Sequence, residues 1–157
     1  MKDATISVAY HEAGHAVIAW RLHLLSNKGA SVVPEEGSKG RVHHNRGRGD
    51  RPDTASTDSA RARVERNVIV ALADIEAQQK YSPSSVRSYH GTTDRDHAID
   101  MLMFITEPTS NEFPVHIKLL KLRARNMVRA HWPQIEVVAA RLRVSKTLTG
   151  NENSRSD

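Results

Sequence analysis

The sequence predicts a mainly α-helical domain with a small β-hairpin or sheet. Three observations support this fold class. Apolar residues recur at three- and four-residue intervals in five long stretches, as expected for amphipathic helices. One short β-prone stretch interrupts them at residues 30–44. The histidine-rich segment His11-Glu12-Ala13-Gly14-His15 lies inside the first periodic stretch, so its side chains should project from a helix.

The expected helices follow this periodicity. The first covers residues 5–25, with Asp3 or Thr5 as its cap and Asn27-Lys28-Gly29 as its end. Asp58 or Ser59 could cap the second helix, and Thr93 with Asp96 resembles a capping box before the third. The other expected helices are residues 58–81, a segment from near Asp94 to Pro108, residues 110–130 and residues 133–148.

The β-prone stretch predicts a hairpin. Ala30–Pro34 would form one strand and Arg41–His44 the other, with turn residues at 35–40 and a polar loop at 45–56. An exposed strand edge beside a metal site could pair with an extended peptide, or the hairpin could be purely structural. Residues 1–150 are expected to form one domain and residues 151–157 a disordered tail.

The composition limits the chemistry. The 157 residues include no cysteine, so disulfides and thiolate metal sites are excluded and any metal must use His, Asp or Glu. No apolar run approaches the roughly 20 residues needed to span a bilayer. The N-terminus lacks the apolar core of a secretory signal. We therefore expect a cytoplasmic protein without membrane contact.

The net charge of +5 and the pI of about 9.8 favour acidic partners such as nucleic acid. However, aromatic residues make up only 4%, and we find no nucleic-acid fold signature. We therefore expect solvated basic faces and regard nucleic-acid binding as the weaker interpretation. The basic residues cluster in a loop (Arg41, Arg46, Arg48, Arg51) and on a helix (Lys118, Lys121, Arg123, Arg125, Arg129).

The segment at residues 11–15 has the HExxH pattern of zinc peptidases. Residues four apart lie on one face of a helix, so His11 and His15 can grip one zinc at roughly 2.0–2.1 Å each. Glu12 then sits beside the metal, where it can take a proton from a bound water and pass it to a leaving amine. The motif predicts a helical HExxH zinc-peptidase domain with Glu12 as general base and acid.

A catalytic zinc usually needs a third protein ligand in addition to water. Spacing alone does not choose among the candidates, which are Asp74, Glu76, His90, Asp94, Asp96 and His97. The pair His43-His44 is expected to be a surface pair rather than a second metal site. The isolated histidines His23, His116 and His131 are expected to be incidental.

The segment HEAGHAV, followed by Ser31-Val32-Val33-Pro34, resembles the peptidase domain of the FtsH-type ATP-dependent zinc metalloproteases. The resemblance implies Asp94 as the third zinc ligand, from the segment His90–Ile99. Gly91 lies one residue closer to this Asp than in the family pattern, which keeps Asp96 as a rival. Ala73-Asp74 replaces a pair of glycines and puts a carboxylate where the family has none.

The resemblance implies a zinc-dependent metalloendopeptidase acting on peptide or protein substrates. The sequence contains neither the AAA+ module nor the membrane anchor of those enzymes, so we expect a stand-alone, peptidase-only relative. A separate AAA+ unfoldase or further copies of the chain would be its partners. The alternative is a non-catalytic, zinc-stabilised module that docks on a partner protein or nucleic acid. The intact Glu12 argues against that alternative, because a structural zinc site does not need it.

Overall fold

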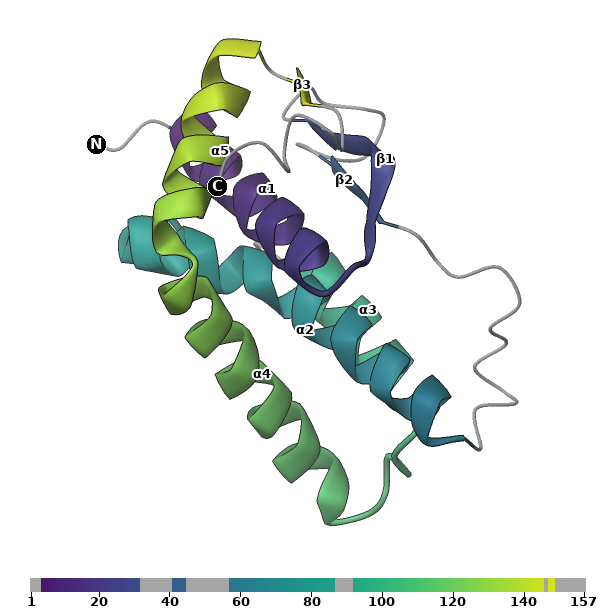
Figure 1. Ribbon diagram of the computed structural model, residues 1–157. Coiled ribbons are helices and arrows are strands. Elements are labelled where there is room, and N and C mark those ends of the chain that lie inside the picture. The colour runs from purple at the N-terminus through teal and green to yellow at the C-terminus, as the bar shows by residue number, and fades with distance from the viewer. Residues whose placement is uncertain (1–3, 32–40, 45–56, 87–91, 146, 149–157) are drawn as a thin grey trace.

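The computed structural model describes residues 4–31, 41–44, 57–86, 92–145 and 147–148. Its architecture is mainly helical, which confirms this part of the predicted fold class (Figure 1). The helices are α1 (Ala4–Arg21), α2 (Asp58–Tyr81), the short 3-10 helix η2 (Pro83–Ser85), α3 (Thr92–Leu102), α4 (Glu112–Ala130) and α5 (Trp132–Ser145). The strands are β1 (Leu25–Ser31), β2 (Arg41–His44) and β3 (Thr147–Leu148).

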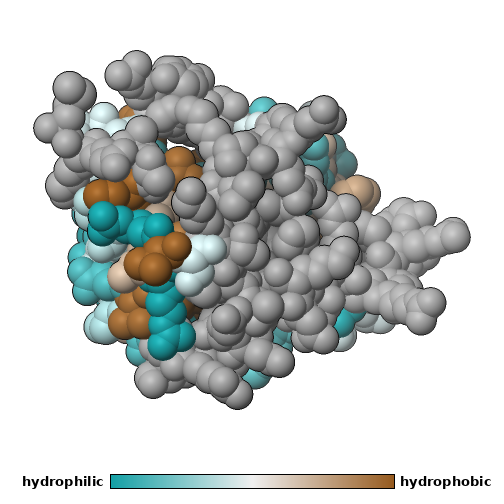
Figure 2. Space-filling model, turned by 90° about the horizontal axis from the view of Figure 1, so that it is seen from above, coloured by the Kyte–Doolittle hydropathy of each residue, from teal (hydrophilic) through white to brown (hydrophobic). Residues whose placement is uncertain are grey.

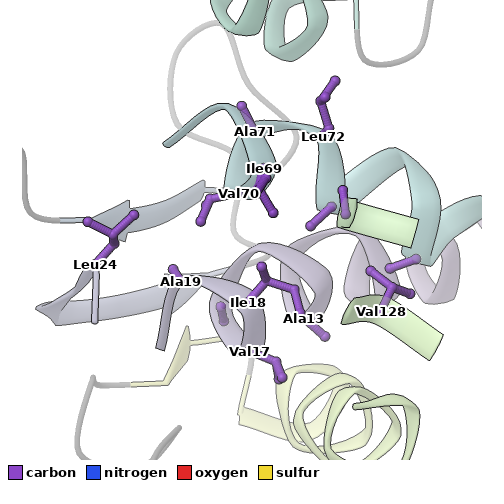
Figure 3. Close-up of a cluster of buried hydrophobic side chains, with 14 of the residues drawn as sticks. Ala13, Val17, Ile18, Ala19, Leu24, Ile69, Val70, Ala71, Leu72 and Val128 are labelled. Carbon is purple, nitrogen blue, oxygen red and sulfur yellow. The ribbon is translucent and has the colours of Figure 1, made fainter. Parts of the chain in front are cut away.

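Helix α2 is the centre of the domain. Helices α1, α3 and α4 pack against it, and α5 packs against α1 (Figure 1). Figure 3 shows Val17 and Ile18 of α1 in one hydrophobic cluster with Ile69 and Val70 of α2 and with Val128 of α4. Because these side chains are buried, they fix how α1 lies on α2.

The contact between α1 and α2 is unusually close at Gly14. A Cβ atom added at this position would lie 2.6 Å from the Cβ of Ala77 and 2.8 Å from the carbonyl oxygen of Ala73. Only a glycine allows the two backbones to approach this far. The small Gly14 of the HExxH segment thus permits the close packing of α1 on α2.

Helix α1 ends at Arg21, earlier than the predicted position 25. His23 adopts a left-handed conformation with φ 58°. The amide of Leu24 donates to the carbonyl of Ala19 at 2.7 Å, and the amide of His23 donates to Trp20 at 3.0 Å. These bonds form a Schellman motif, which ends the helix without a glycine.

The strands form a three-stranded antiparallel sheet in the order β2-β1-β3. Strand β1 begins at Leu25 rather than at the predicted Ala30, and β2 has the predicted bounds. Ala30 of β1 is paired with Val42 of β2 on one side and with Leu148 of β3 on the other. The predicted turn at 35–40, the polar loop at 45–56 and the tail at 151–157 lie outside the described residues.

Several other helix ends also differ from the predictions, and α3 ends at Leu102 rather than near Pro108. Thr57, rather than Asp58 or Ser59, caps α2, because its hydroxyl accepts from the amide of Ala60 at 3.2 Å. Thr93 lies inside α3, so the expected capping box does not form there. Helix α5 ends at Ser145, and the chain then enters β3.

None of the helices described in the structure is both long and apolar enough to cross a membrane. In the view from above, hydrophobic and hydrophilic residues lie next to one another over the coloured part of the surface (Figure 2).

Candidate metal centre

Four side chains from three helices converge on one point. They are His11 and His15 of α1, Asp74 of α2 and Asp94 of α3, here called the metal cluster. Each offers one ligand atom, and these four atoms all lie within 4.8 Å of one another. The sequence-predicted ligands His11, His15 and Asp94 are therefore neighbours, and Asp74 joins them.

The distances match the size of a metal coordination shell. The Nε2 atoms of His11 and His15 each lie 3.2 Å from Oδ2 of Asp74. Asp94 lies 3.7 Å from His11 Nε2 and 4.0 Å from His15 Nε2. A tetrahedral zinc with bonds of roughly 2.0–2.1 Å separates its ligand atoms by about 3.3–3.4 Å. The four donors would need only small shifts to surround such an ion.

Helical spacing explains how α1 and α2 meet here. His11 and His15 are four residues apart, as are Asp74 and Gln78, so each pair lies on one helix face. The close contact at Gly14 brings these two faces together. Asp74 then reaches both imidazoles, and Gln78 reaches the far side of the His11 ring.

Gln78 is a site residue that the sequence analysis missed. Its Oε1 lies 3.2 Å from Nδ1 of His11, and its Nε2 donates to the carbonyl and the hydroxyl of Ser85 at 3.2 and 3.3 Å. The amide is thus anchored by η2, with Oε1 free to accept from Nδ1–H. This bond directs Nε2 of His11 into the cluster, because a hydrogen bond at one ring nitrogen fixes which nitrogen of a histidine faces a metal. Its position four residues after Asp74 is a signal that could have identified it.

The burial and the hydrogen bonding of the Asp74 carboxylate show whether the cluster suits a cation. Its side chain is 0% exposed. Its Oδ1 accepts from the amide of Ile75, whereas its buried Oδ2 accepts no hydrogen bond from the described part of the chain. A buried carboxylate oxygen is costly unless it is paired or coordinates a metal. Two imidazoles and two carboxylates also form a donor set suited to zinc and to other first-row divalent ions.

The histidines and aspartates of the cluster shift one another's pKa values toward the charged forms. Burial alone would lower the pKa of His11, but the carboxylates of Asp74 and Asp94 raise it from 6.5 to about 10. The pKa of His15 is also raised, against the effect of burial, chiefly by Asp74. Burial would raise the pKa of Asp94, but its bond to His11 and the charge of His15 hold it well below its ordinary value. These shifts favour the protonated form of His11 in the metal-free cluster at neutral pH.

Glu12 lies beside the cluster rather than in it. It is 4% exposed, and its Oε1 is 4.0 Å from Nε2 of His11. Burial raises its pKa from 4.5 to about 7, although the two histidines oppose this shift. A carboxylate that titrates near neutral pH can both accept and donate a proton.

The remaining ligand candidates lie elsewhere. Asp96 and His97 are on α3 but outside the cluster, and Asp96 is exposed. Glu76 accepts from Nε of Arg125 at 2.8 Å and does not join it. His90 lies outside the described residues, and for His43-His44 the structure describes only the backbone of β2.

The packing of α4 on α2 gives two charged regions contacts that spacing along one helix does not reveal. His116 is not incidental, because its Nε2 donates to Glu65 at 3.0 Å and its Nδ1 accepts from the hydroxyl of Thr106 at 2.7 Å. Most of the basic residues of α4 are exposed, as expected of a solvated face: Lys118, Lys121, Arg123 and Arg129. Arg123 also pairs with Glu65 at 3.2 Å, and Arg125 pairs with Glu76.

Comparison with protein-family models and with curated proteins gives no match to this sequence. The assignment of a function therefore depends on the residues of the cluster and on their geometry.

Proposed function

We propose that this protein is a zinc-dependent metalloendopeptidase in which His11, His15 and Asp94 hold the zinc. Glu12 is the general base and general acid. One observation carries the proposal: the buried carboxylate of Glu12 lies directly beside a convergent group of metal-binding side chains. A purely structural metal site has no use for such a group.

When bound, zinc activates a water molecule and polarises the peptide carbonyl. The chain's own residues handle the protons. Glu12, buried beside His11, would accept a proton from the attacking water and return it to the departing amine. Gln78 holds the His11 ring so that its Nε2 faces the cluster.

The substrate class and partners follow from the resemblance to FtsH-type peptidase domains. Peptides or unfolded proteins are the substrates that this proposal requires. A separate AAA+ unfoldase would supply unfolded chains, and further copies of this chain could surround the site. The cysteine-free sequence suits a reducing compartment, so we place the activity in the cytoplasm.

Asp74 favours a second candidate, a non-catalytic module stabilised by zinc. A tetrahedral zinc with four protein donors has no position left for water. If Asp74 and Asp94 both stay on the metal permanently in a tetrahedral shell, the site would be structural. This candidate leaves the burial and the position of Glu12 without a role.

The test compares the wild type with Glu12→Gln and uses Glu65→Gln as a matched control. Both glutamates lie beside a histidine, but Glu65 is outside the metal cluster. Zinc content and hydrolysis of an unfolded protein or a peptide library are measured. We expect Glu12→Gln to keep zinc and to lose about 10²–10⁴-fold in activity, and Glu65→Gln to keep both.

Full activity of purified Glu12→Gln would contradict the mechanism. A wild type that binds zinc stoichiometrically and hydrolyses no peptide in the library would favour the non-catalytic module. A wild type that binds no zinc would contradict both candidates.

A further inference from the structure

We infer that Asp74 is a fourth protein ligand of the metal, in addition to His11, His15 and Asp94. The inference rests on the proposed metal site but not on the proposed hydrolysis. The resemblance does not supply it, because a pair of glycines occupies this place in the family pattern. In the resting protein, four protein donors would then surround the ion.

The geometry ranks Asp74 ahead of Asp94 as a ligand. Its Oδ2 lies 3.2 Å from the Nε2 atoms of both histidines, whereas the corresponding contacts of Asp94 are 3.7 and 4.0 Å. A single oxygen equidistant from the two imidazoles occupies a corner of the coordination shell. An ion held by both histidines would thus lie within reach of this oxygen without any movement of α2.

The position of Oδ2 shows why a simple ion pair would not suffice once metal is bound. In this structure the Nε2 atoms of His11 and His15 both lie 3.2 Å from Oδ2 of Asp74. A metal takes the Nε2 lone pairs of both rings, so neither ring can keep a proton on that atom. Oδ2 of Asp74 is buried and has no other hydrogen-bond partner in the described chain, so only ligation would then compensate it.

The backbone leaves Asp74 little freedom to withdraw. It lies between Ala73 and Ala77, the two residues that contact Gly14 of α1. Moving this part of α2 away would open the closest contact between the two helices. The side chain of Asp94 is 37% exposed and lies in the first turn of α3. Of the two carboxylates, it is therefore the one that could move away from the ion more easily. Water and substrate would accordingly enter by displacing Asp94 or by raising the coordination number.

The absence of cysteine from the sequence allows a direct test with cobalt. Asp74→Cys places the only thiol of the protein at the inferred ligand position. Bound to this variant, Co²⁺ should show a thiolate-to-cobalt charge-transfer band that the wild type lacks. Glu76→Cys is the matched control, since residue 76 is also buried on α2 but lies outside the cluster, and it should show no band.

Asp74→Asn provides an independent measurement of zinc affinity by competition with a chromophoric chelator. We expect at least about a tenfold loss, because removing even an indirect partner of a ligand costs 10–100-fold. Glu76→Gln should bind zinc as the wild type does. Circular dichroism checks that each variant is folded, and the two Asp74 variants test the same position by different readouts.

The outcomes separate the two proposals. A wild type that binds neither zinc nor cobalt overturns the metal site itself. The role of Asp74 alone is overturned if three results are found together. The wild type binds metal, Asp74→Asn binds zinc with the same affinity as the wild type, and Asp74→Cys with Co²⁺ shows no charge-transfer band. The band in Asp74→Cys but not in Glu76→Cys supports it, whether or not the protein hydrolyses peptides.

Discussion

Helix α2 carries two places where histidine meets carboxylate, and they differ in how their polar atoms are satisfied. In the first, Asp74 faces His11 and His15 in the metal cluster. In the second, here called the His116 cluster, Glu65 contacts His116 and Arg123. Both clusters pair histidine with a carboxylate of α2.

The His116 cluster is complete without a ligand. Both ring nitrogens of His116 are bonded, one to Glu65 and one to Thr106, and each carboxylate oxygen of Glu65 has a donor. In the metal cluster, Oδ2 of Asp74 and Nδ1 of His15 are buried without a hydrogen-bond partner in the described chain. Because buried polar groups are nearly always paired, convergence with incomplete pairing distinguishes a candidate metal site from a structural cluster of histidine and carboxylate.

The largest expected difference between the clusters is in metal affinity. His15→Ala removes a direct donor and should weaken zinc binding by at least about a hundredfold. His116→Ala should leave the zinc affinity unchanged. Competition with a chromophoric chelator measures both. Equal losses in the two variants would mean that the clusters do not differ in the way proposed.

The next effect concerns the contact that builds the metal cluster. Gly14→Ala should lower the free energy of unfolding by about 1–3 kcal/mol through overpacking, because its Cβ would meet Ala77 and the backbone of Ala73. This outweighs the roughly 1 kcal/mol that alanine gains over glycine in a helix. Urea unfolding of the metal-free protein measures the change. A more stable variant would contradict the close approach of α1 and α2.

The pH dependence of zinc binding should also separate the clusters. The pKa of His11 is raised to about 10, so a metal must displace its proton at neutral pH. Zinc affinity should therefore rise about tenfold per pH unit for each proton displaced. Calorimetry in buffers of different ionisation enthalpy counts the released protons. His116→Ala should release the same number, whereas the absence of any proton release would contradict the charge state of the metal cluster.

The metal-free protein should show the opposite trend in stability. A histidine whose pKa is raised on folding, from 6.5 to about 10 for His11, stabilises the fold fully below pH 6.5. That stabilisation is lost as the pH rises toward 10. The melting temperature, measured in the presence of a chelator, should thus fall between pH 7 and pH 10 more steeply for the wild type than for His11→Gln.

The smallest expected effect is at the His116 cluster. Glu65→Gln weakens a partly exposed network and should cost about 1 kcal/mol of folding free energy. Urea unfolding measures this cost, and zinc affinity should stay at the wild-type value. A loss of zinc affinity in this variant would show that the two clusters are coupled through α2.

Local patterns in the sequence predicted much of the fold. The helical periodicity anticipated α2 closely, and the spacing of His11 and His15 anticipated a shared face of α1. The left-handed turn at His23 could not be predicted, because histidine seldom replaces glycine at such a position. The pairing of β3 with β1 is also a long-range contact with no local signal.

The candidate site was predictable only in part for the same reason. Asp74 was one of several carboxylates with suitable chemistry, and nothing near it in the sequence distinguished it from Glu76. Its selection depends on the register between α1 and α2, which Gly14 sets in three dimensions. Gln78 and His116 acquire their roles through the same kind of interhelical contact.

The origin of the ligands in three helices has a consequence for chain entropy. An ion bound by His15, Asp74 and Asp94 would close two long loops of the polypeptide at once, one from α1 to α2 and one from α2 to α3. In the unfolded chain, closing such loops costs conformational entropy, so the ion would bind the folded protein more tightly than the unfolded chain. The free energy of metal binding therefore becomes free energy of folding. In a chain without cysteine, the ion would serve as the cross-link that a disulfide provides elsewhere.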